Sequence, residues 1–301
     1  MKYDLDGFSY FLGDLSESTV NSYKGIIRRF LDFTNKDLAE ITLNDYGKYS
    51  NSISNATSSY KILVYSALKR FSKYLFANQI SSTDYMEFVE RPRFRETIKT
   101  KKRREKSVLE PDEVKALKES IINGIGSSKA KSYQKHLKER DLAIFMVFMS
   151  TGIRCSALHN LDIDNINYDE KSLLVIDKGS KIKEYILSES SWNALQNWLG
   201  KRSEIAKKDE KALFVTKYGD RISNKSIYNM IKKYAQVIKG KDISPHKLRA
   251  TYGTQLLNAT GDIYLVKECM NHSRISTTML YIRNNENTTK KASEIMNGLI
   301  S

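Results

Sequence analysis

A strongly basic segment divides this chain of 301 residues into two parts. Residues 91–106, RPRFRETIKTKKRREK, carry nine basic and two acidic side chains, a net charge of +7. Residues 1–90 before it are close to neutral, with 10 basic and 11 acidic side chains. Residues 107–301 after it are basic, with 31 basic and 22 acidic side chains. The length allows about two domains, so we expect two folded units joined by a basic linker.

The charge distribution indicates the kind of partner. The total of +15 is concentrated in the linker and the second part, which favours a polyanion such as DNA over a merely solvated linker. A membrane surface fits less well, because the basic run has few bulky apolar residues at helical spacing. The longest apolar stretch, residues 142–149, is too short to span a bilayer, and no secretory signal is evident. With two cysteines and no metal-ligand spacing, we expect a reduced, cytoplasmic protein without a metal site.

The first part reads as a small helical bundle. Val20, Tyr23, Ile27 and Phe30 recur at steps of three and four residues, which predicts a helix over 16–34. A second long helix is predicted over 57–78, with the following residues facing inward: Tyr60, Leu63, Val64, Leu68, Phe71 and Leu75. Shorter helices are expected near 43–53 and 83–89, and no strand is expected before residue 90.

The second part mixes helices with a short β region. Pro111 stands where a helix can begin, so a helix is predicted over 111–122. A second helix is predicted over 137–150, with an exposed loop at 123–134 between the two. Three short antiparallel strands are expected in IDNINY, SLLVID and KEYILS, separated by turn-forming residues. Further helices are expected at about 190–200, 223–238, 244–259, 262–270, 276–281 and 289–299. The predicted class is mainly α with a small antiparallel sheet.

Three segments of the second part carry side chains suited to phosphate chemistry. They are STGIRCSALHNL with Arg154, SPHKLRATYGTQLL with His246 and Arg249, and NHSRISTTMLYI with His272 and Tyr281. Together they resemble the boxes of the tyrosine recombinase (phage-integrase-like) family. TGIRCSAL is similar to the family's arginine motif, HKLR to its His-x-x-Arg box, and the tyrosine stands nine residues after the last histidine, as in its third box.

A fourth match lies on the predicted β-hairpin, where Lys178 occupies the place of the family's lysine in a Lys-Gly-x-Lys turn. The resemblance implies a helical, SAM-like core-DNA-binding domain over 1–92, a basic linker over 93–108 and an α+β catalytic domain over 109–301. It also implies that a C-terminal helix at about 289–300 docks onto a neighbouring protomer.

The resemblance assigns a role to each residue, and physical chemistry supports the assignment. Arg154 and Arg249 can each donate a planar fork to the non-bridging phosphate oxygens, and one such donor is typically worth about 3–4 kcal/mol in the transition state. Tyr281 is the nucleophile; with an ordinary pKa of about 10, a tyrosine needs activation, for which His246 is the candidate base. Lys178 is our candidate for the acid that protonates the departing 5′ oxygen. His272 is expected to donate a hydrogen bond to the phosphate. No metal or nucleotide cofactor is required, because the phosphotyrosyl bond conserves the bond energy.

Taken singly, each of these side chains would most often be structural; the interpretation depends on all of them occurring in the family's order. Three positions depart from the family pattern. Ala157 stands where a glutamate usually braces the first arginine, Asn271 replaces the glycine before the last histidine, and Ala250 replaces a second histidine. Asparagine tolerates left-handed backbone angles, so we expect the turn at 271 to survive. His136 and His159 match no box and are expected to be structural or exposed.

The expected partner is double-stranded DNA with inverted-repeat core sites, bound by a dimer on one site and by a tetramer in the synapse. Phosphate contacts are expected from the basic residues of the linker and of the second long helix. They are Arg91, Arg93, Arg95, Lys99, Lys101, Lys102, Arg103, Arg104, Lys106, Lys61, Lys69, Arg70 and Lys73. The alternatives are a type IB topoisomerase with the same chemistry, a catalytically silent DNA-binding regulator and a metal-dependent nuclease. The biological role, whether integration and excision of a mobile element, resolution or inversion, stays open.

Overall fold

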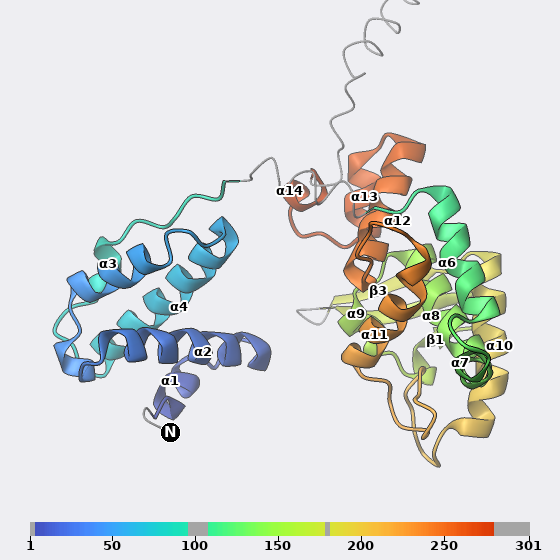
Figure 1. Cartoon of the computed structure of the whole chain (residues 1–301), viewed down its shortest axis with the longest axis horizontal. Helices are drawn as coiled ribbons and strands as arrows, with labels where there is room; N and C mark the ends of the chain where they lie inside the picture. Colours follow the sequence, from blue (N-terminus) through green and yellow to red (C-terminus); the bar gives the residue numbers. More distant parts are fainter. Residues whose placement is uncertain (1–3, 96–107, 178–180, 280–301) are drawn as a thin grey trace, which may run out of the picture. The chain divides into compact units, whose positions relative to one another are not determined.

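The computed structural model describes residues 4–95, 108–177 and 181–279. The chain separates into two compact units, residues 1–101 and 102–301, so the division falls inside the basic segment. Each unit has its own hydrophobic core. Mostly helical units with one small antiparallel sheet are the class that the sequence predicts (Figure 1).

The described residues of the first unit form helices joined by loops, with no strand among them. Its elements are α1 (Asp6–Phe11), α2 (Glu17–Thr34), the 3₁₀ helix η1 (Leu38–Glu40), α3 (Leu43–Ser52), α4 (Ser58–Ala77) and the 3₁₀ helix η2 (Tyr85–Phe88). The two long helices lie where apolar periodicity predicts them, and α4 is capped by Thr57, whose side chain accepts a hydrogen bond from the amide of Tyr60.

Aromatic rings form the centre of this unit. Phe71 of α4 meets Phe8 of α1 edge to face, with ring centroids 5.3 Å apart, and Phe30 of α2 stacks on Tyr46 of α3 at 4.9 Å. One inward prediction is wrong: Leu63 is 37% exposed. It lies one residue before buried Val64, just outside the apolar stripe of α4.

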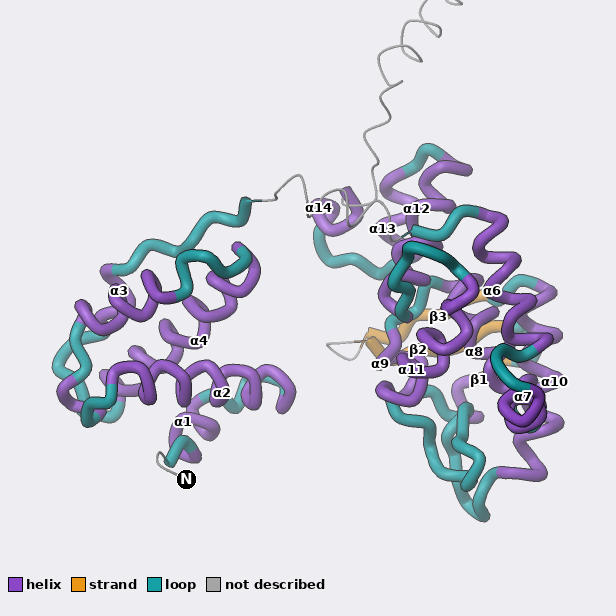
Figure 2. Tube along the Cα trace, in the orientation of Figure 1, coloured by secondary structure: helices purple, strands orange, loops and turns teal. Residues whose placement is uncertain are grey.

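The described residues of the second unit contain the other helices and the sheet. Its elements are α6 (Pro111–Asn123), α7 (Ser128–Lys135), α8 (Lys138–Thr151), α9 (Cys155–His159), η3 (Ile163–Asn165), β1 (Ile166–Asn167), β2 (Ser172–Asp177), β3 (Lys181–Ile186), α10 (Glu189–Ile205), α11 (Asn224–Tyr234), η4 (Ala235–Val237), α12 (Pro245–Thr260), α13 (Ile263–Cys269) and α14 (Ile275–Thr278). The strands form one antiparallel sheet in the order β1-β2-β3 (orange in Figure 2).

Helix α8 is the central element of the second core. It contains the apolar stretch 142–149, and α6, α10 and α12 all pack against it. Five of its apolar side chains are at most 1% exposed: Ala143, Ile144, Phe145, Val147 and Phe148. The stretch 142–149 is apolar on nearly all sides of the helix, and the sequence therefore predicts the buried helix that the structure has.

The structure corrects several local predictions. The expected loop at 123–134 contains α7, which is capped by Ser127, whose side chain accepts from the amide of Ala130. The buried side chain of Gln134 accepts from the amide of Ile125 and donates to its carbonyl, so α7 is tied to the loop before it. The expected helix at 83–89 is only η2, and the sequence pattern does not predict the short helices α1 and α9. The prediction for 276–281 places a helix near α14 but extends beyond the described residues, and the one for 289–299 lies wholly outside them.

Candidate active site

Arg154 follows the tight turn that ends the central helix α8. The helix stops at Gly152, which has a left-handed φ of +60°, and two residues later Arg154 is the N-cap residue of α9. Its guanidinium is half-buried and donates to the backbone carbonyl of Asn271, with Nη2 3.2 Å from the oxygen. The arginine that the sequence singles out therefore contacts the segment that leads to His272.

Helix α12 carries His246 and Arg249 on one face, since residues three apart in a helix are neighbours. Arg249 is 4% exposed. Its guanidinium donates to the carbonyl of Gly152 at the end of α8 and to that of Met270 after α13. Those two hydrogen bonds hold the buried guanidinium of Arg249 between the turn after α8 and the turn after α13.

His272 lies beyond α13 in a turn that requires an unusual backbone. Asn271 has φ +49°, so the left-handed conformation expected at this position is present without a glycine. The ring of His272 is 7% exposed, and its Nδ1 is 2.9 Å from the hydroxyl oxygen of Thr278 on α14, which is fully buried. Nδ1 is thus engaged by the protein, which fixes the orientation of the ring.

Ala157 stands where a glutamate would brace Arg154, and the arginine has a main-chain acceptor elsewhere. Ala157 packs against the hydrophobic core and offers no polar side-chain atom to Arg154. The carbonyl of Asn271 accepts a hydrogen bond from Arg154. The acceptor is a main-chain oxygen, so the contact does not depend on the residue type at position 271.

The electrostatic environment favours neutral histidines. Burial lowers the pKa of His272 to about 4, and the positive charges of Arg249, Arg154 and Lys183, together with His246, act in the same direction. The pKa of His246 is also lowered, first by desolvation and then by Lys247 and Arg249, although the residue stays open to solvent. A neutral, accessible imidazole at His246 can accept a proton.

Three predicted site residues from three segments therefore meet at one turn: Arg154, Arg249 and His272. A fourth, His246, is near enough to help lower the pKa of His272. Another residue at this turn, Lys183 of β3, is absent from the sequence prediction. Its ammonium group donates to the carbonyls of Glu268 and of Cys269, the latter at 3.0 Å. No sequence signal reveals it, because its acceptors are backbone oxygens that every residue possesses.

The other predicted site residues have different outcomes. Tyr281 and Lys178 lie outside the described residues, as do the following basic residues of the linker: Lys99, Lys101, Lys102, Arg103, Arg104 and Lys106. Arg91, Arg93 and Arg95 are exposed after η2. On α4, Lys69 and Lys73 are exposed and Lys61 is half-buried, whereas Arg70 is 3.2 Å from the carboxylate of Asp14 in an ion pair.

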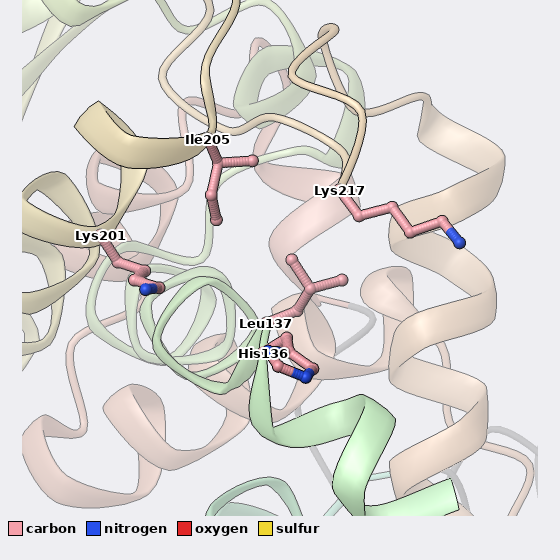
Figure 3. A pocket seen from close by; sticks show the side chains of 5 residues that line it. All are labelled: His136, Leu137, Lys201, Ile205 and Lys217. Atoms are coloured by element: carbon pink, nitrogen blue, oxygen red, sulfur yellow. The ribbon is translucent and has the colours of Figure 1, made fainter.

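The two remaining histidines lie apart from this turn. His159 Nδ1 is 2.7 Å from the carbonyl oxygen of Ile222, a structural contact. His136 ends α7 and lines a cavity of about 310 Å³ with Leu137, Lys201, Ile205 and Lys217 (Figure 3). Leu137 and Ile205 extend into this cavity and the Lys217 side chain extends away from it, so it is mainly apolar and holds none of the predicted catalytic residues.

Two features of the described residues bear on other functions. Within 4–95, 108–177 and 181–279, no three His, Cys, Asp or Glu side chains are grouped so that they could hold a metal ion. None of the helices in those ranges is long and apolar enough to cross a membrane.

The arrangement suits an anionic substrate. Two guanidiniums, one buried and one half-buried, lie beside one turn and provide planar donors for phosphate oxygens. Carbonyl acceptors of the protein itself maintain their orientation, which is the preorganisation that stabilises charge developing in a transition state.

Comparison with known proteins agrees with this geometry. Residues 107–288 match the phage integrase family. Tyrosine recombinase XerC of Alcanivorax borkumensis is 29% identical over 273 residues, which cover 89% of this chain and 83% of that protein. XerC of Corynebacterium glutamicum is 38% identical over 142 residues, which span only about half of either protein, 47% of this chain and 46% of the relative.

Solved structures share the fold. The XerH site-specific recombinase bound to a palindromic difH substrate superposes with a TM-score of 0.72 at 19% identity, covering 92% of this chain and 80% of that one. A lambda integrase dimer bound to a COC′ core site gives a TM-score of 0.67 at 14% identity, covering 94% and 95%. The family match spans more than half of the chain and contains all the residues gathered at the turn, so this protein belongs to the phage integrase family of tyrosine recombinases.

Proposed function

We propose that this protein is a site-specific recombinase that cuts and rejoins DNA through a 3′-phosphotyrosyl intermediate. The observation that carries the proposal is the convergence of Arg154, Arg249 and His272 on the turn after α13, from parts of the chain that span more than a hundred residues. A structural role alone does not require two arginines and a histidine at one turn.

In the proposed reaction, the Tyr281 oxygen attacks the scissile phosphorus and the bond to the 5′ oxygen breaks. His246 accepts the phenol proton, and Lys178 gives a proton to the leaving 5′ oxygen. Arg154 and Arg249 hold the two non-bridging oxygens. His272 donates from its Nε2, in the tautomer whose Nδ1 accepts from the hydroxyl of Thr278. A free 5′-hydroxyl from another strand reverses the step, so the net result is strand exchange without a metal or nucleotide cofactor.

The proposed partner is double-stranded DNA with inverted-repeat core sites, bound by two protomers per site and four per synapse. Three facts support it: the +7 segment 91–106, the basic second part and the similarity to recombinases whose structures contain DNA core sites. In this scheme residues 1–92 and 109–301 contact the duplex, 93–108 links them along it, and the helix at about 289–300 docks onto the next protomer. The chemistry serves integration and excision of a mobile element, resolution or inversion equally well.

The test uses a nicked suicide site, in which cleavage releases a short fragment and traps the covalent adduct. The wild-type protein should form a protein–DNA adduct that survives denaturation, and Tyr281→Phe should form none while binding the site equally well. Tyr264→Phe is a matched control, because Tyr264 on α13 is an exposed tyrosine outside the boxes. An adduct that persists in Tyr281→Phe contradicts the assignment, and relaxation of supercoils without strand exchange between two sites points to the topoisomerase alternative.

A further inference from the structure

One turn of the second unit receives an unusual set of hydrogen bonds. The carbonyls of residues 268–271, here called the carbonyl turn, all accept from cationic side chains of other elements. Lys183 of β3 donates to the first two, Arg249 of α12 to the third and Arg154 before α9 to the fourth. The carbonyl turn forms the C-terminal end of α13, where the helix dipole favours positive charge, and His272 follows it directly.

Two of the three cations are already assigned to phosphate binding, and Lys183 is the third. It lies on β3 opposite Val175 of β2 and shares the inner face of the strand with Tyr185, which is 6% exposed. Its ammonium group lies 5.0 Å from the centre of the Tyr185 ring and reaches out of the sheet to α13. The residues that alternate with it, Ile182 and Ile186, are 71% and 69% exposed and belong to the outer face.

These contacts join two parts of the proposed active site. The β2–β3 hairpin is paired from Ser172↔Ile186 to Asp177↔Lys181, and Lys178 immediately follows the last residue of β2. A side chain that ties β3 to the carbonyl turn therefore links the two paired strands of this hairpin to the segment that carries His272. Lys183 also contributes to the positive field that lowers the pKa of His272, which is consistent with its closeness to that ring.

We propose that Lys183 is a positioning residue, which ties the β2–β3 hairpin to the carbonyl turn and thereby holds Lys178 where it can protonate the leaving 5′ oxygen. The inference rests on the proposed function, in which Lys178 is the general acid. Lys183 itself transfers no proton in this scheme; it donates hydrogen bonds to the carbonyls of Glu268 and Cys269.

The leaving group offers a way to separate positioning from general structural support. An oxygen leaving group is strongly basic and departs slowly unless an acid protonates it. A 5′-bridging sulfur departs as a thiolate, whose conjugate acid has a pKa of about 8.5, so it needs no acid. A variant that only misplaces the acid is slow on the oxygen site and fast on the sulfur site, whereas a variant that misfolds or loses phosphate binding is slow on both.

The experiment measures single-turnover cleavage by the full-length protein on a nicked site with either a 5′-bridging oxygen or a 5′-bridging sulfur. Lys183→Met should lower the rate on oxygen by roughly 10²-fold, the effect of a misplacement of about 1 Å, and should cleave sulfur at nearly the wild-type rate. Lys183→Arg, which keeps the charge and the donors, should restore most of the oxygen rate. Lys115→Met, an exposed substitution on α6, is the control and should match the wild type on both sites.

The different failures can be told apart. If Lys183→Met is slowed equally on both sites, or on neither, Lys183 does not position the acid and the inference is overturned. If the wild type forms no adduct, or if Lys178→Met is not rescued by sulfur, the proposed function or its choice of acid fails, and this result is independent of any Lys183 variant.

Discussion

The guanidinium of Arg249 donates a hydrogen bond to the backbone carbonyl of Gly152, joining α12 to the turn that ends α8. Gly152 leads within two residues to Arg154, so this bond connects the two arginines through the main chain. The same glycine faces Tyr252, three residues after Arg249 on α12: a Cβ added at Gly152 would lie 2.3 Å from the ring carbon Cδ1 of Tyr252. The distance between the arginine-bearing segments therefore depends on the absence of a side chain at one position.

Gly152→Ala should destabilise the protein and reduce cleavage together. Residue 152 has φ +60°, which costs a non-glycine residue about 1–2 kcal/mol, and the clash with Tyr252 adds about 1–3 kcal/mol of overpacking. Urea unfolding measures the loss of stability. Gly200→Ala is the matched control: Gly200 lies in α10, where an added Cβ would meet no atom within 4 Å, and alanine there should stabilise the helix by up to about 1 kcal/mol. Equal effects of the two substitutions would contradict this account.

Asn271 should accept glycine but not a β-branched residue. At φ +49°, Asn271→Gly removes a side chain that is tolerated there, so stability and adduct formation should change little. Asn271→Val should force the backbone out of this region and move the carbonyl that accepts from Arg154. We expect about a tenfold or greater loss of cleavage for valine, in keeping with a misplaced phosphate donor. Site binding in the absence of cleavage, measured by gel shift, distinguishes this from a loss of folding.

His272 should make stability depend on pH on the acid side. Its pKa in the folded protein is about 4, below the ordinary value of 6.5. As the pH falls below about 6.5, the histidine of the unfolded chain takes up a proton and that of the folded chain does not, so the free energy of unfolding falls until the pH reaches about 4. The expected slope is at most about 1.4 kcal/mol per pH unit. Above pH 6.5 the contribution is fully present.

Urea unfolding at several pH values between 4 and 7 tests this, with the slope as the readout. His272→Gln should flatten the pH dependence even if it lowers stability overall. His136→Gln, at the exposed end of α7, is the matched histidine substitution with which the slope is compared. A slope that is unchanged in His272→Gln would assign the pH dependence to other groups.

The sequence predicts the elements whose pattern is long and local, and misses those determined by distant partners. The two long helices α2 and α4 and the apolar α8 follow from periodicity or apolar character over ten or more residues. Helix α7 has a Lys- and Ser-rich sequence without an apolar stripe, so its pattern indicates a loop; the bonds between Gln134 and Ile125 hold it. Helices α1 and α9, of six and five residues, are too short to show a period.

In the candidate site, too, the sequence predicts some features and misses others. Arg154, His246, Arg249 and His272 stand in motifs, so sequence spacing identifies them without their geometry. What holds them is mostly backbone: the carbonyls of Gly152 and of the carbonyl turn. Main-chain acceptors have no residue type, so neither these contacts nor Lys183 could be read from the sequence.

The proposed C-terminal docking helix gives a prediction about assembly. Removing residues 289–301 should leave binding to a single site intact, because both proposed DNA-contacting domains remain. It should abolish recombination between two sites, because the protomers of the synapse lose the contact that couples them. Gel shift on one site and strand exchange between two sites measure the two outcomes, and normal strand exchange by the truncated protein would refute docking in trans.

The exposed lysines of α4 should contribute phosphate contacts, whereas the arginine beside them should contribute less. Lys69 and Lys73 are exposed to solvent, but Arg70 is partly neutralised by Asp14, 3.2 Å away. Each phosphate contact releases counterions and adds about 0.9 to the slope of log affinity against log salt concentration. The double variant Lys69→Gln/Lys73→Gln should therefore reduce that slope by about 2 without changing the unfolding midpoint. Arg70→Gln should change the slope by less than about half a unit, because a guanidinium that stays paired with Asp14 neutralises no phosphate and releases no counterion. If Arg70→Gln has the larger effect, the ion pair opens on DNA and the face of α4 that meets the duplex is centred on Arg70.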